Sequence, residues 1–197
     1  MNSTDGLKIL GLAHAYLRTA VAGVPADRWG AATPCDQWTV RQVLNHARLD
    51  QQAYAAAITG EGGPQSDPFQ PADALDGDFV QVLEDVLAKA FDAYAQLPAD
   101  AAEAPTPLGP LPVWLGATAA ALDAGVHAWD IAVATGQDLP LEAELAEGLS
   151  AAADQLVDRI RDAYGVYAPA VRQVEDGDRA AALLAFVGRD PRWSPAG

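Results

Sequence analysis

The chain has 197 residues, of which 50% are hydrophobic. This composition is enough for one sizeable core, and the length favours a single domain. Aspartate and glutamate number 27 against 12 lysines and arginines, so the formal net charge of −15 disfavours nucleic acid and anionic membranes as partners. A single cysteine excludes a disulfide within the chain and a cysteine-based zinc site. No apolar run reaches the roughly 18 residues of a membrane-spanning helix, and the N-terminus has no signal-peptide pattern, so we expect a cytoplasmic protein.

Two helices are indicated in the first 60 residues. Apolar residues recur at helical spacing over 7–21, and glycine and proline follow this segment. Farther along, Thr39 and Gln42 have the spacing of a capping box, in which each side chain bonds to the backbone of the other residue. We therefore expect a second helix that begins at Thr39 and ends at Gly60.

The rest of the chain indicates four more helices. Periodicity places them at about 76–97, 112–135, 141–163 and 178–187. The helix over 112–135 is apolar on almost every face, which predicts that it is buried. The expected fold is all-α, a four-helix bundle with additional C-terminal helices. Residues 1–197 are interpreted as one domain, with the bundle core at about 5–165 and a C-terminal extension at about 166–197.

Three polar residues interrupt the fourth predicted helix. Asp123, His127 and Asp130 are spaced by four and three, so they share one helix face. Burying such groups without partners costs several kcal/mol, so they must form a hydrogen-bonded network or bind a metal ion. If the second and fourth helices are neighbours, His46, Asp123 and His127 supply two imidazoles and a carboxylate, a ligand set that suits zinc, nickel or iron. Asp130 and Asp50 are then expected to bond to the histidine ligands and orient them.

A metal-free interpretation of the same residues stays open. His46 could pair with Asp50, and His127 with Asp123 or Asp130, as hydrogen-bonded core residues.

The remaining candidate side chains indicate packing rather than chemistry. His14 is interpreted as packed or solvated, and Cys35 as a packed thiol, because no basic residue lies near it in the sequence. Trp38 is expected to pack at the start of the second helix, and Trp129 to pack in the core or to line a pocket beside His127.

Three stretches of the sequence resemble a known family. They are TPCDQWTVRQVLNHA (33–47), VHAWDIAVATGQDLP (126–140) and LLAFVGRDPRW (183–193). Together they are similar to the signature stretches of an actinobacterial family within the DinB-like superfamily, the group that contains mycothiol-dependent maleylpyruvate isomerase. The likeness extends over nearly the whole chain.

This resemblance implies a DinB-like bundle with a divalent metal ion, usually zinc or nickel. A histidine of the second helix and an acidic residue and histidine four apart on a later helix hold the metal, and these positions are His46, Asp123 and His127 here. The isomerase has glutamate where this chain has Asp123, so the carboxylate here is one methylene shorter. The resemblance also implies a thiol-dependent activity, with mycothiol or a similar thiol as cosubstrate.

The sequence thus leads to one functional hypothesis and one alternative. The hypothesis is a metal-binding S-transferase or isomerase that joins a small-molecule thiol and a small electrophile, with a metal-bound thiolate or water as nucleophile. The loops 61–75 and 98–112 are expected to shape its substrate pocket. The alternative is a non-catalytic bundle that binds a ligand or partner, with a buried His/Asp network. Apolar helix faces would also suit a homodimer.

Overall fold

The computed structural model describes residues 1–75, 77–171 and 177–195, and these are mainly helical. Within these ranges the elements, in chain order, are α1 (Ser3–Ala22), α2 (Val40–Thr59), α3 (Phe79–Ala95), β1 (Glu103–Ala104), β2 (Leu111–Pro112), α4 (Val113–Ala134), α5 (Ala143–Tyr164) and α6 (Arg179–Phe186). Each helix expected from periodicity is present. The boundaries differ from the predicted ones by a few residues at most.

Capping sets the start of the first two helices. The backbone N–H of Thr39 donates to the side chain of Gln42 at 3.0 Å, and the Gln42 N–H donates back to the Thr39 hydroxyl. This capping box was predicted, and it begins α2 where expected. Asn2 and Asp5 form a second capping box, which extends α1 four residues before the first apolar position, Leu7.

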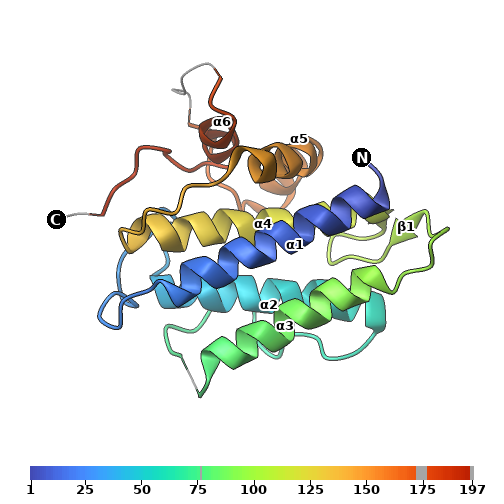
Figure 1. Cartoon of the computed structure of the whole chain (residues 1–197), viewed down its shortest axis with the longest axis horizontal. Helices are drawn as coiled ribbons and strands as arrows, with labels where there is room; N and C mark the ends of the chain where they lie inside the picture. The colour runs from blue at the N-terminus through green and yellow to red at the C-terminus, as the bar shows by residue number, and fades with distance from the viewer. Residues whose placement is uncertain (76, 172–176, 196–197) are drawn as a thin grey trace.

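The first four helices form a bundle in which each helix packs on two others. α1 packs on α4 and α3, and α2 packs on the other sides of α3 and α4 (Figure 1). α5 lies against α4 and α1 outside this bundle, and α6 packs on α5. The all-α fold expected from the sequence is therefore confirmed. The bundle core was expected to extend to about residue 165, but the four bundled helices end with α4, and α5 packs on their outside.

α4 is the buried centre of the molecule. Nearly all of its residues are buried, as the apolar sequence on every face predicted. Glycines allow its neighbours to approach closely. A Cβ at Gly6 of α1 would lie 2.8 Å from the Trp114 backbone, and a Cβ at Gly125 would lie 2.7 Å from Leu149 of α5. Polar side chains on α4 must therefore find partners within the protein.

The sequence did not indicate the small antiparallel sheet before α4. β1 and β2 pair through Glu103 with Pro112 and Ala104 with Leu111, inside the segment expected to be a loop. Strands of two residues are too short to show alternating hydrophobicity, so pattern analysis has no means of finding them. In the described parts of the chain, no helix is both long and apolar enough to cross a membrane.

Candidate metal centre

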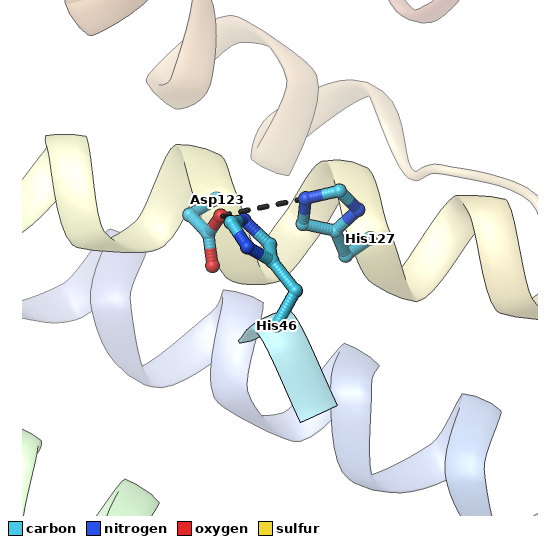
Figure 2. Close-up of side chains that lie close together, drawn as sticks. All are labelled: His46, Asp123 and His127. Carbon is cyan, nitrogen blue, oxygen red and sulfur yellow. Dashed lines mark hydrogen bonds and ion pairs between the residues drawn. The ribbon is translucent and has the colours of Figure 1, made fainter. Parts of the chain in front are cut away.

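His46, Asp123 and His127 meet between α2 and α4. Asp123 Oδ1 lies 3.1 Å from His46 Nε2 and 3.5 Å from His127 Nε2. The possible ligand atoms of all three residues lie within 4.8 Å of one another. Figure 2 shows the three side chains pointing toward one another, His46 from α2 and the other two from α4. The structure thus brings together the three residues that the helix spacing selected.

Helix geometry explains this convergence. Asp123 and His127 are one turn apart on α4, so their side chains lie on the same face. α2 packs directly on α4, which places His46 opposite that face. Both histidines are only 6% exposed, so water cannot satisfy most of their polar atoms.

The protonation of His46 follows from its second partner. Nδ1 of His46 lies 2.8 Å from the carbonyl oxygen of Pro68, in the loop between α2 and α3. Because a carbonyl can only accept, Nδ1 carries a proton and donates it. In the neutral ring, Nε2 therefore presents a lone pair toward Asp123, which is the tautomer that binds a metal ion.

His127 is oriented in the same way by a carboxylate. Its Nδ1 donates to Asp130 Oδ2 at 3.0 Å, which leaves Nε2 facing Asp123. Asp130 is fully buried and also accepts two hydrogen bonds from Arg189, at 3.2 and 3.0 Å. Burial alone would raise the pKa of Asp130, but the Arg189 guanidinium and the bond from His127 hold it below its usual value. Asp130 is therefore a carboxylate that orients His127.

The cluster has nitrogen and oxygen atoms that can bind a divalent metal ion, and one of its oxygens lacks a hydrogen-bond partner. Among the described residues, none bonds to Asp123 Oδ2, although this oxygen is buried. Burial by itself would lower the pKa of His46, yet the neighbouring Asp123 carboxylate raises it to about 9. At neutral pH His46 is therefore protonated, and its Nε2 donates to Asp123 Oδ1. Two imidazole nitrogens and one carboxylate fit a divalent metal ion, which would replace that proton and bind the unpartnered oxygen.

Asp50, the other residue expected to orient a ligand, has a different place. It lies one turn after His46 and lines the same pocket, but the hydrogen-bond partners of His46 are Pro68 and Asp123. Burial and the charge of Asp123 raise the pKa of Asp50 to about 8. The Pro68 carbonyl takes the position that Asp50 was expected to fill, because a loop oxygen reaches Nδ1 from the side away from Asp123.

The third histidine and the cysteine lie outside the cluster. His14 is buried in α1 and bonds to Gln51 Oε1 at 2.8 Å, and its burial lowers its pKa to about 4. Burial raises the pKa of Cys35 to about 11, so it remains a protonated thiol. Both residues agree with their interpretation as packing residues, although Cys35 also lines the pocket described next.

A pocket of about 720 Å³ opens onto the three clustered side chains. Such a volume is typical of small-molecule sites. The two loops expected to shape it contribute Phe69 and Leu108. Trp38 stacks against His46 with ring centroids 4.6 Å apart and lines the pocket, whereas it was expected only to pack at the helix start. Trp129 is buried in the core and is not among the described lining residues.

Sequence reasoning missed the part of the wall that comes from the C-terminal region. Residues of the segments 165–171 and 188–193 close one side of the pocket, and Arg189 reaches Asp130 from there. One signal was available, because Arg189 follows the apolar run LLAFVG, and a cation there needs a buried acidic partner. The sequence alone does not identify Asp130 as that acidic partner.

A helical bundle with a buried His/Asp cluster at the base of a pocket defines the class of protein, a candidate metal-binding four-helix bundle. The family described as "Mycothiol maleylpyruvate isomerase N-terminal domain" matches residues 10–132. The chain belongs to this family, which confirms the resemblance inferred from its sequence.

Individual relatives agree with this assignment. The uncharacterized proteins Rv0738 and MT0763 from two strains of Mycobacterium tuberculosis are each 31% identical over 176 residues, covering 87% of this chain and 91% of the relative. Crystal structures of mycothiol-dependent maleylpyruvate isomerase and of a histidine-to-alanine mutant of it share the fold, with TM-scores of 0.58 and 0.61. Each is 18% identical, and the match covers 80% of this chain and 71% of the isomerase chain.

Proposed function

We propose that this protein is a metal-dependent enzyme that uses a low-molecular-weight thiol, mycothiol in the first instance, as an S-transferase or isomerase of a small electrophile. The observation that carries the proposal is the arrangement of His46, Asp123 and His127. The Nε2 atoms of both histidines converge at a pocket with a buried carboxylate oxygen that has no partner among the described residues. Membership of a family described by a mycothiol-dependent isomerase supports the choice of thiol.

In this proposal His46, Asp123 and His127 hold a divalent metal ion, with zinc or nickel as the first candidates. Three protein ligands leave at least one position for a substrate atom, as in catalytic rather than structural sites. The bound cation would lower the pKa of a coordinating thiol, so that the sulfur is a thiolate nucleophile at neutral pH.

The protein's own groups orient the two imidazoles and partly cover them. The Pro68 carbonyl and the Asp130 carboxylate hold the two imidazoles with Nε2 toward the site. Trp38 and Phe69 cover His46 with their rings at 4.6 and 6.0 Å and limit the access of water. Cys35, with its pKa of about 11, stays protonated and does not compete with an incoming thiol as nucleophile.

The deciding experiment is a metal analysis of protein purified without an affinity tag or chelator. We expect about one equivalent of a transition metal by mass spectrometry, and its loss in the His46→Ala, His127→Ala double variant. Asp123→Asn keeps the shape of the side chain and should weaken retention without unfolding the protein. His14→Gln is the matched control, because it removes the one buried histidine outside the cluster.

The alternative is a non-catalytic ligand- or partner-binding bundle, and one observation favours it. A proton on His46 would satisfy the His46–Asp123 contact without a metal ion, as the raised pKa of His46 indicates. Wild-type protein that stays metal-free after incubation with zinc and with nickel would reject the enzyme proposal in favour of this alternative.

A further inference from the structure

The wall of the pocket is aromatic over much of its extent. Trp38 lies before α2, Tyr54 on α2 and Phe69 in the following loop, while Tyr167 and Trp193 come from the C-terminal region. Rings from such separate segments can stack on both faces of a flat molecule. This wall therefore favours apolar and planar ligands.

The charges around the same pocket are mainly negative. Outside the His/Asp cluster, Asp36, Asp50 and Asp190 are the acidic residues among the described lining residues, and Arg189 is the one basic residue there other than histidine. The raised pKa of Asp50, about 8, means that this residue adds little negative charge at neutral pH. Arg192 contacts Asp190 from outside the pocket, but this cation is largely exposed, and such pairs contribute little.

The single lining arginine is not available to a ligand. Its Nε and Nη2 donate to Asp130, and its Nη1 donates to the carbonyl oxygen of Val187. Arg189 is only 6% exposed, and the charge of the fully buried Asp130 compensates its own. The described part of the wall therefore has no unpaired guanidinium or ammonium group that could pair with the carboxylate of a ligand.

We propose that the electrophile taken by this pocket is an uncharged molecule with a flat apolar part, and that Asp36 and Asp190 discriminate against anions. This inference rests on the proposed function, because it specifies the substrate class of the same site. Asp36 and Asp190, here called the acidic rim, would repel an anion in this pocket, whereas a neutral ring would give up only its hydration. The rim residues act on substrate choice and are not metal ligands.

The test compares two inert ligands that differ in charge but share a ring system, 2-naphthamide and 2-naphthoate. Isothermal titration of the protein as purified, at low salt and neutral pH, measures both affinities without thiol, turnover or added metal. We expect the neutral amide to bind at least about fivefold more tightly than the carboxylate, the effect of roughly one unit charge near the rim. Added salt should reduce the ratio, because it screens the rim.

Two double variants with the same change in net charge locate the effect. Asp36→Asn with Asp190→Asn should bring the ratio close to one, while Asp85→Asn with Asp92→Asn should leave it unchanged. The latter two acids lie on α3, which contributes no residue to the described pocket wall. Asparagine at position 190 can still accept the bonds that Arg192 donates, so the local fold should persist.

Three results would overturn the inference. These are equal or tighter binding of 2-naphthoate, no binding of either ring, or the same ratio in both double variants. Because the probes need no metal ion, a protein that stays metal-free after incubation with zinc and with nickel, yet still prefers the amide, would refute the proposed enzyme while leaving the pocket's charge selectivity intact.

Discussion

His14 and His46 are both buried histidines, yet their surroundings shift their pKa values in opposite directions. Burial dominates at His14, whose partner is the neutral amide of Gln51, and its pKa falls to about 4. At His46 the charge of Asp123 outweighs burial, and the pKa rises to about 9. A buried histidine therefore becomes a metal-site candidate or a core residue according to the residue it faces.

The low pKa of His14 makes stability depend on pH. His14 is neutral in the fold down to about pH 4, whereas in the unfolded chain it binds a proton below about pH 6.5, so stability falls as the pH drops from 6.5 to 4. The fall in the pKa of His14 from 6.5 to about 4 corresponds to about 3 kcal/mol of stability. Urea unfolding of His14→Gln across this range should show a shallower loss than wild type by roughly that amount. Parallel pH profiles of the two proteins would contradict this account.

At the scale of the elements, the contact between α1 and α4 positions one side of the bundle. Gly6 of α1 brings the backbones close, since a Cβ there would lie 2.8 Å from the Trp114 Cα and carbonyl oxygen. Backbone atoms cannot move aside as a flexible side chain can. The same helix contains Gly11, where a Cβ would lie 3.4 Å from the Phe91 ring, an ordinary contact distance.

These two glycines give a matched pair of substitutions. Gly6→Ala should destabilise the protein by about 1–3 kcal/mol, because the added methyl group forces α1 away from α4. Gly11→Ala should instead be neutral or stabilise by up to about 1 kcal/mol through helix propensity. Thermal unfolding of both variants measures the difference. If Gly6→Ala proves as stable as Gly11→Ala, the close helix contact is not there in solution.

At the scale of the whole molecule, net charge opposes folding. The formal charge of −15 acts on a compact chain of 197 residues. Exposed ion pairs such as that between Lys8 and Glu144 offset little of this repulsion. Low ionic strength should therefore be unfavourable to the fold.

Salt should stabilise this protein. Raising sodium chloride from about 0.02 to 0.5 M shortens the Debye length from roughly 20 Å to less than 5 Å, so the acidic groups repel one another less. We expect the midpoint of thermal unfolding to rise over this range, and to rise less in the Asp85→Asn, Asp92→Asn variant, which carries two fewer negative charges. A midpoint that falls with added salt would show that attractive pairs dominate.

The helices and the three clustered residues could be predicted from the sequence because their signals are local. Hydrophobic periodicity and the capping box at Thr39 determine where helices form, and the spacing of Asp123 and His127 determines that they share a face. His46 required one further assumption, that α2 and α4 are neighbours, and the bundle satisfies it. The family could also be recognised at this level, since its characteristic stretches are short and contiguous.

The partners that orient the cluster were decided only by the tertiary structure. Pro68 lies 22 residues from His46 and Arg189 lies 59 from Asp130, so no helical spacing relates the members of either pair. The aromatic and acidic wall of the pocket likewise comes from segments that span most of the chain. Periodicity reports which face of a helix is buried, but it does not report which distant segment covers that face. Packing of the C-terminal region against α4 and α5 makes that choice, and with it the charge of the pocket.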